Sequence, residues 1–156
     1  MALFLVQHGI SSSKAVDPGK GLSDLGIEET NRIALVAKGY GIPVHTIVHS
    51  GKKRAEQTAA IYHRALSLKT PLEAIPGINP LDDVRIFAAG IDPHANWMVV
   101  GHMPFMERLV SYLVAGSEVI RVYQFQNSGI VCLDCGEGHN GEPDWFIKWT
   151  LNPHIT

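Results

Sequence analysis

Short apolar runs alternate with amphipathic stretches over the first two thirds of the chain. The apolar runs occupy residues 2–6, 46–48 and 97–100, and polar residues or glycine follow each of them. Uninterrupted apolar runs of this length are typical of strands that are buried on both faces of a sheet. We therefore predict a buried strand at each of these three positions.

The stretches between these runs carry apolar residues at helical spacing. They predict helices over residues 23–40, 53–66, 82–89 and 104–115. Ser23 is suited to cap the first helix, and Pro104 to occupy the first position of the last. The buried face of the first helix is expected to include Ile33, Val36, Ala37 and Tyr40. The proline-punctuated segment 72–80 is expected to be irregular.

The last third of the chain changes to β pattern. Residues 121–125, 129–133 and 145–149 predict strands, and a loop rich in Gly, Asn and Glu joins the last two into a hairpin. Trp145, Phe146 and Trp149 are expected to alternate between core and surface. The whole pattern predicts one α/β domain over residues 1–156, with a mostly parallel central sheet, helices on both faces and an antiparallel C-terminal edge.

Composition and charge narrow the classes of function. Thirteen basic and fifteen acidic residues give a net charge of −2, whereas bulk binding to nucleic acid or anionic membranes needs a basic excess. No apolar run is long enough to span a membrane, and residues 1–6 lack the basic region of a signal peptide. Two cysteines cannot build a disulfide framework. We expect a cytoplasmic protein that binds neither nucleic acid nor membranes.

A histidine follows each of the three predicted strands. His8 follows the first strand, His49 the second and His102 the third. Ligands of open α/β sheets bind beyond the carboxyl ends of the strands, where all three histidines are expected. His8 and His102 each lie beside a glycine, which permits a ligand to approach the backbone closely. These two histidines are therefore the first candidates for a functional site.

A cationic group is predicted at the same edge of the sheet. Arg54 lies in the first turn of the helix that follows the second strand, while its neighbours Lys52 and Lys53 are interpreted as solvated. The N-terminus of that helix adds free N–H groups and partial positive charge. Two imidazoles, a guanidinium and a helix N-terminus together suit a phosphoryl group, because one imidazole can attack phosphorus while the cations neutralise its oxygens.

Three motifs in this order resemble the histidine phosphatase (phosphoglycerate-mutase-like) superfamily. Residues 5–9, Leu-Val-Gln-His-Gly, resemble its Arg-His-Gly signature, and residues 50–59 resemble its second motif, in which Ala-x-Gln-Thr follows an Arg. Residues 99–104 resemble the motif of the second catalytic histidine. The short chain and residues 127–130, Asn-Ser-Gly-Ile, are most similar to SixA-type phosphohistidine phosphatases. The resemblance covers nearly the whole sequence.

The resemblance implies a role for each matching residue. His8 would be the nucleophile that becomes phosphorylated, His102 would stabilise the phosphoryl group in transfer, and Arg54 would bind its oxygens. Gly9 would lie against the phosphate. Lys20 falls where SixA-type members often place an Arg, so it is either one more cation of the site or a solvated loop lysine.

The chain departs from the family pattern at two positions. Gln7 replaces the Arg that precedes the nucleophile, and an amide donates a hydrogen bond to phosphate without the charged, bidentate grip of a guanidinium. Gly77 stands where many relatives carry the Glu that protonates the leaving group. Asp82 and Asp83 lie close by, and we interpret them as the start of a helix.

Two other groupings are interpreted as structural. Cys132 and Cys135 have only His139 nearby as a further metal ligand, so we expect them to be strand residues on opposite faces. His45 and His49 lie on one strand about 13 Å apart, which is too far for one metal ion.

The sequence thus predicts a phosphatase that forms a phosphohistidine at His8 and needs no metal or other cofactor, because its cations are side chains. Protein phosphohistidine is the favoured substrate, since no lid domain large enough to enclose a small metabolite is visible. A missing acid also matters least for a phosphoramidate, whose departing nitrogen can already be protonated. The alternatives are a phosphatase of a small phosphorylated metabolite, and a weakened or inactive relative that binds phosphorylated protein without turnover.

Overall fold

The fold is built on a six-stranded mixed sheet. The computed structural model describes residues 1–155, and Thr156, the last residue of the predicted domain, lies outside the described residues. The strands are ordered β3-β2-β4-β1-β5-β6 across the sheet. Their bounds are β1 (Leu3–Gln7), β2 (Thr46–His49), β3 (Glu73–Ala74), β4 (Trp97–Gly101), β5 (Ile130–Glu137) and β6 (Pro143–Leu151).

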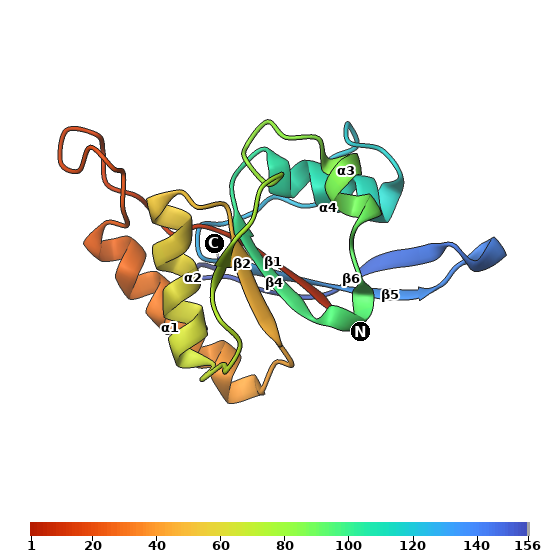
Figure 1. The fold of residues 1–156 in the computed structure, drawn as a ribbon, viewed down its shortest axis with the longest axis horizontal. Coiled ribbons are helices and arrows are strands. Elements are labelled where there is room, and N and C mark those ends of the chain that lie inside the picture. The colour runs from red at the N-terminus through yellow and green to blue at the C-terminus, as the bar shows by residue number, and fades with distance from the viewer. Residues whose placement is uncertain (156) are drawn as a thin grey trace.

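Helices cover both faces of this sheet. Helices α1 and α2 pack on one face, and α3 and α4 pack on the other (Figure 1). The helical elements are α1 (Asp24–Tyr40), α2 (Lys53–Ala65), α3 (Val84–Ala89), α4 (Phe105–Ala115) and the short 3-10 turns η1 (Pro93–Ala95) and η2 (His139–Gly141). The predicted three-layer α/β fold with an antiparallel C-terminal edge is confirmed. Within residues 1–155, no helix combines the length and the apolar character needed to cross a bilayer.

Strand β1 lies in the middle of the sheet. It pairs with β4 in parallel and with β5 in antiparallel orientation. Phe4 and Val6 pack into the core beneath α1 and α2, while Leu3 and Leu5 pack into the core beneath α3 and α4. Because successive strand residues point to opposite faces, a strand between two cores needs an unbroken apolar run. This explains why the run 2–6 predicted β1 to within one residue.

Helix α1 begins as predicted but turns a different stripe inward. Ser23 caps it by accepting a hydrogen bond from the Gly26 N–H at 3.1 Å. The expected buried residues Val36 and Tyr40 are exposed, Tyr40 to 79%. The buried positions are Gly26, Glu29, Thr30, Ile33, Ala34 and Ala37. Small residues within this stripe let α1 approach its neighbours closely, so the two larger side chains lie outside the contact.

The predicted strand over 121–125 was wrong. Strand β1 is already paired with β4 and β5, and the other edge of β5 is paired with β6. Residues 121–125 therefore have no free strand edge next to β1 or β5 with which to pair. Instead, Tyr123 and Phe125 stack edge to face with ring centroids 5.3 Å apart and pack on the core beneath α3 and α4. Smaller corrections are that 72–80 contains the two-residue strand β3, and that Pro104 precedes α4 by one residue.

A β-bulge divides strand β6. Cys132 pairs with Trp149 and Leu133 pairs with Ile147, so Lys148 is an extra residue. The bulge puts Trp145 in the core beneath α4 and Trp149 on the opposite face against Phe4, with ring centroids 5.9 Å apart. Trp145 is buried and Phe146 is exposed, as predicted, but Trp149 does not share the face of Trp145.

Candidate active site

The carboxyl ends of the parallel strands bring the predicted histidines to one edge of the sheet. His8 follows β1, and its N–H donates to the carbonyl of Gly101, the last residue of β4, at 3.0 Å. His102 comes directly after Gly101. The rings of His8 and His102 lie with centroids 5.0 Å apart and planes tilted by 52°. The structure therefore brings together the two histidines that the sequence analysis ranked first.

Hydrogen bonds define the tautomer of His8. Its Nδ1 lies 2.7 Å from the Gly9 carbonyl oxygen, which can only accept, so Nδ1 carries the proton. In the neutral ring, Nε2 then carries the lone pair, and it accepts a hydrogen bond from Arg54 Nε at 3.2 Å. Nε2 is consequently a nucleophilic nitrogen next to a guanidinium.

Arg54 reaches His8 from the first turn of α2. Gly51, at φ 88°, makes the turn between β2 and the helix, a conformation that favours glycine. Lys52 is the N-cap residue, and its side chain is exposed, as predicted. Arg54 is partly buried, with its side chain turned to the two histidines rather than to solvent.

His102 is almost completely buried, with 1% of its surface exposed. Its Nε2 is hydrogen-bonded to Ser50 Oγ. Ser50 Oγ also accepts the Lys52 N–H at 3.4 Å, and its hydroxyl has both a donor and a second acceptor site for the contact with His102. The other ring nitrogen of His102, Nδ1, is buried and has no hydrogen-bond partner among residues 1–155.

Both histidines are held in the neutral form. The pKa of His8 is lowered from 6.5 to about 4, mainly because burial disfavours the charged ring, and its bond to Gly9 only partly offsets this. The positive charges of Arg54 and Lys20 lower the pKa of His8 further. Burial also lowers the pKa of His102 to about 3, and the positive charges of Arg54 and Lys52 lower it further. A neutral imidazole keeps the lone pair that nucleophilic attack requires.

Lys20 lies on a tightly held loop beside this site. Asp17 accepts hydrogen bonds from the Gly19 and Gly21 N–H groups, at 3.0 and 2.9 Å, and forms a 2.8 Å ion pair with Lys53. Lys20 has a φ of 51°, and its positive charge lies close enough to His8 to lower the pKa of that ring. Lys20 thus lies near His8, and its role as a cation of the site stays a prediction.

Gln7 and Gly9 flank His8 in different ways. The Gln7 backbone is fixed between Gly101 of β4 and the Ser128 N–H, which donates to the Gln7 carbonyl at 2.9 Å. No hydrogen bond of the Gln7 side chain occurs within residues 1–155. Gly9 is tightly enclosed, since a Cβ there would lie 2.8 Å from Thr30 Oγ1 and 3.0 Å from Ser128 Oγ. Glycine is therefore required at this position for packing.

The remaining candidates, Gly77, Asp82 and Asp83, lie on the segment between β3 and α3. Gly77, at φ 86°, is exposed and has open space where a side chain would be. Asp83 caps α3 by accepting the Arg85 N–H at 2.9 Å, and it was predicted to lie at the start of a helix. Asp82 accepts the Asn79 N–H at 2.8 Å. Both carboxylates thus bond to local backbone N–H groups, which agrees with their interpretation as the start of a helix.

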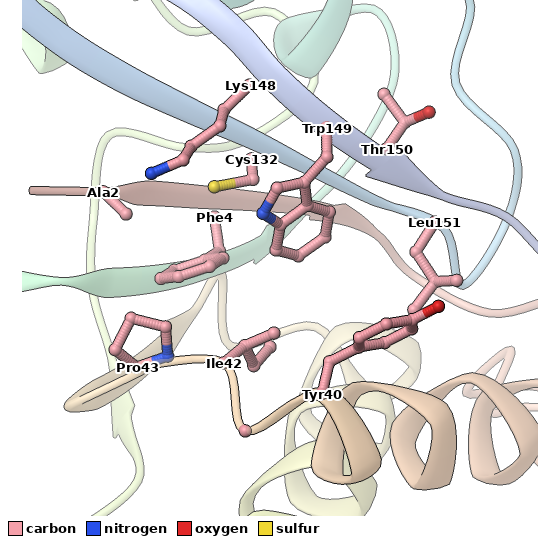
Figure 2. Close-up of a pocket in the computed structure, with 11 residues that line it drawn as sticks. Ala2, Phe4, Tyr40, Ile42, Pro43, Cys132, Lys148, Trp149, Thr150 and Leu151 are labelled. Atoms are coloured by element: carbon pink, nitrogen blue, oxygen red, sulfur yellow. The ribbon is translucent and has the colours of Figure 1, made fainter.

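The cysteine pair also lies elsewhere. Cys132 and Cys135 point into the two opposite cores of the sheet, as predicted for strand residues. Burial raises the pKa of the Cys132 thiol to about 11. Cys132 lines an apolar pocket of about 500 Å³ with Phe4, Tyr40 and Trp149, whereas His8, Arg54 and His102 line none of it (Figure 2). Within residues 1–155, no three His, Cys, Asp or Glu side chains gather as a metal site would require.

Three site residues were not predicted as such, namely Ser50, Thr58 and Asn127. Thr58 Oγ1 accepts the Gly9 N–H at 2.9 Å, and Asn127 Nδ2 donates to the His8 carbonyl at 2.8 Å. All three lie inside the motifs that carry the family resemblance, which was the available signal. Their contacts join residues about 50 to 120 positions apart, so sequence spacing alone does not reveal them.

The buried neutral histidines predict a pH dependence of stability. Because the pKa of His102 is about 3 in the folded chain and 6.5 when unfolded, the unfolded chain binds more protons between these values. Stability is therefore full above pH 6.5 and is lost as the pH falls towards 3. We expect wild type to lose about 1–2 kcal/mol more than His102→Asn between pH 7 and pH 5, measured by urea unfolding. Equal slopes in the two proteins would contradict the neutral, buried state of His102.

No family model and no curated protein sequence matches this chain. Among solved structures, the protein histidine phosphatase SixA complexed with tungstate superposes with a TM-score of 0.81 at 25% identity, covering 98% of this chain and 97% of that one. The putative phosphohistidine phosphatase SixA from Agrobacterium tumefaciens gives 0.75 at 22% identity, covering 97% of both chains. A mycobacterial glucosyl-3-phosphoglycerate phosphatase complexed with VO3 gives 0.66 at 14%, covering 95% and 97%.

These similarities confirm the resemblance to the histidine phosphatase superfamily. The chain has the phosphoglycerate-mutase-like fold of these phosphatases over nearly its whole length. The similar structures include phosphatases of protein phosphohistidine and of small phosphorylated molecules, according to their descriptions.

Proposed function

We propose that this protein is a phosphatase that hydrolyses phosphohistidine on a protein through a covalent phosphohistidine at His8. The observation that carries the proposal is the state of the His8 ring. Its Nδ1 proton is tied to the Gly9 carbonyl, and its pKa of about 4 leaves Nε2 unprotonated at neutral pH. Arg54 lies against that same nitrogen, so a cation is present where a phosphoryl group would be attacked.

The first step transfers the phosphoryl group. Arg54 leaves Nε2 and binds the phosphoryl oxygens, supported by Lys20 and by His102, whose ring centroid lies 5.0 Å from that of His8. His8 Nε2 then attacks phosphorus and forms a P–N bond, while the P–N bond of the substrate breaks and the departing imidazole keeps the electron pair and its proton. The proposed product is phosphorylated His8 and a free histidine on the substrate protein.

The second step regenerates the enzyme. Water attacks phosphorus and loses a proton to solvent, the P–Nε2 bond of His8 breaks with its electron pair returning to Nε2, and inorganic phosphate leaves. Positively charged side chains carry the charge stabilisation in both steps, so the proposal needs no metal or cofactor.

Substrate choice follows from the three positions at which the sequence analysis looked for an acid. Asp82 and Asp83 are committed to backbone N–H groups, and Gly77 offers no carboxylate. A leaving alkoxide needs a proton donor, whereas the imidazole of a phosphohistidine departs as a neutral ring when its other nitrogen already carries a proton. This supports a phosphoramidate over an alkyl phosphate.

Gln7 favours a second candidate function, binding of phosphorylated protein without turnover. A charge-assisted bond contributes about 1.5–3 kcal/mol, so an amide in place of a guanidinium weakens the phosphoryl site substantially. The two candidates differ in whether phosphate is released.

One assay separates these functions. Purified full-length protein is incubated with a phosphohistidine peptide and, separately, with small phosphomonoesters, each with and without excess EDTA, and phosphate release is measured. We expect release from the peptide that EDTA does not prevent, and much slower release from the esters. Binding of the peptide without release would support the binding function instead, and faster release from an ester would assign a small-metabolite substrate.

A further inference from the structure

The peptide bond between His8 and Gly9 is held from both sides. Asn127 Nδ2 donates to the His8 carbonyl oxygen at 2.8 Å, and the Gly9 N–H donates to Thr58 Oγ1 at 2.9 Å. Asn127 comes from the loop before β5 and Thr58 from α2, so side chains of two segments distant in sequence hydrogen-bond to the same peptide group. Neither side chain belongs to the groups that would touch a phosphoryl substrate in the proposed reaction.

This peptide plane determines where the His8 ring can point. The His8 side chain departs from one end of the plane, and the Gly9 carbonyl that holds Nδ1–H lies just beyond the other end. Glycine has wide conformational freedom, so the backbone at Gly9 needs outside restraint to keep that carbonyl in place. Rotation of the plane would break the hydrogen bond from His8 Nδ1 to the Gly9 carbonyl. The ring would then no longer be restricted to the tautomer that has its lone pair on Nε2.

Asn127 is suited to supply this restraint because the next residue is immobilised. Ser128 is fully buried and has a φ of 66°, which is uncommon for a residue other than glycine. Its N–H donates to the Gln7 carbonyl at 2.9 Å, its Oγ is 2.7 Å from Thr30 Oγ1, and its carbonyl accepts from the Tyr62 hydroxyl. Such a backbone persists only where surrounding bonds fix it, and here three do so.

The residue before Asn127 is also tethered. The Gln126 side-chain amide donates to the His154 carbonyl at 3.0 Å and accepts the His154 N–H at 3.1 Å. The Gly129 N–H donates to the Gln126 carbonyl at 3.0 Å and closes the turn that contains Asn127. The Asn127 amide thus starts from a fixed backbone, so little conformational entropy opposes its bond to His8.

We propose that Asn127 is a positioning residue that keeps the His8 imidazole in its Nδ1–H tautomer with Nε2 directed into the phosphoryl site. The expected effect of Asn127 on kcat rests on the proposed function. Its expected effect on the His8 tautomer does not. Asn127 acts through the His8 backbone, with Thr58 as the opposing contact.

The test is Asn127→Ala in the full chain. We expect kcat for the phosphohistidine peptide to fall roughly tenfold to a hundredfold, because misdirecting a nucleophile by about 1 Å costs this much. KM should change less than about threefold, since the groups that bind the phosphoryl oxygens remain. In ¹⁵N NMR spectra of the imidazoles, the His8 signals should shift from a pure Nδ1–H pattern towards a mixture of tautomers.

Asn127→Asp provides a second variant of nearly the same shape. An ionised carboxylate cannot donate to a carbonyl, so it should lose kcat and the tautomer pattern as Asn127→Ala does, even if the alanine variant folds poorly. Asn31→Ala is the matched control. It removes an amide-to-carbonyl bond of 2.9 Å within α1, from Asn31 to Ile27, and should leave both readouts unchanged.

Two results would overturn the proposal. One is an unchanged His8 tautomer in both Asn127 variants, with any fall in kcat matching the fraction of protein unfolded. The other is a higher KM with an unchanged kcat, which would make Asn127 a group that binds substrate. The tautomer measurement needs no turnover, so a protein without phosphatase activity would refute the proposed function while still testing the role of Asn127.

Discussion

His8→Ala should abolish hydrolysis of the phosphohistidine peptide, lowering kcat roughly 10⁴-fold or more, because no other group can form the covalent intermediate. In wild type, brief exposure to substrate should leave a phosphoryl label that is labile in acid and stable in base. The variant should carry no such label. The backbone bonds at this position, to Gly101 and Asn127, do not involve the imidazole, so the fold should persist. Circular dichroism and thermal unfolding check this.

His45→Ala is the appropriate control for this experiment. His45 is exposed, and its ring contacts only Thr46 Oγ1, at 3.0 Å, within the described residues. His49 is less suitable, because its Nδ1 accepts the Gly51 N–H beside Ser50, the partner of His102. A label that survives in His8→Ala, or equal losses in His8→Ala and His45→Ala, would mean that the nucleophile is a different residue.

Gln7→Arg should raise kcat/KM by about 1–3 kcal/mol in transition-state terms, or roughly fivefold to more than a hundredfold. Arginine would add a charge and a bidentate fork beside the phosphoryl oxygens. The Gln7 backbone is fixed by Gly101 and Ser128, so the substitution changes the side chain without moving the strand. Affinity for inorganic phosphate should also increase, and high salt should remove part of the gain.

Gln124→Arg tests whether the gain is local. Gln124 is exposed and forms no hydrogen bond with His8, Arg54 or His102 within the described residues, so the variant adds the same charge outside this group and should leave kcat/KM almost unchanged. A similar gain in both variants would indicate a general attraction between the protein and its substrate. Lower activity in Gln7→Arg would show that the site is adapted to the amide, and no turnover in either form would favour the binding function.

The elements that sequence predicted best are those whose pattern comes from their own packing. The run 2–6 predicted β1 because a central strand is buried on both faces, and Ser23 predicted the start of α1 because its side chain caps the helix locally. The failed strand at 121–125 has equally suitable residues. Whether residues 121–125 form a strand depends on which strand edges of the sheet are already paired. The pattern of residues within the segment does not contain this information.

The site was predictable to a similar degree. His8, His102 and Arg54 could be found because strand ends and a helix start determine where they lie. The bond from Arg54 to His8, the Ser50 contact with His102 and the Asn127 contact with His8 could not, since each depends on how two separate segments are oriented. The order of strands and helices in the sequence predicted that His8, His102 and Arg54 lie at one edge of the sheet. Their tautomers and protonation depend on tertiary packing, which the sequence pattern does not show.

The position of β1 has a consequence for folding. Its partners β4 and β5 come late in the sequence, and Leu3 pairs with Leu133. During synthesis, β1 therefore leaves the ribosome well before either neighbour and stays unpaired until β4 and β5 have followed. Contacts of such long sequence separation also slow folding, because the intervening chain must be ordered before they form. His8 is thus made long before the segments that define its chemistry.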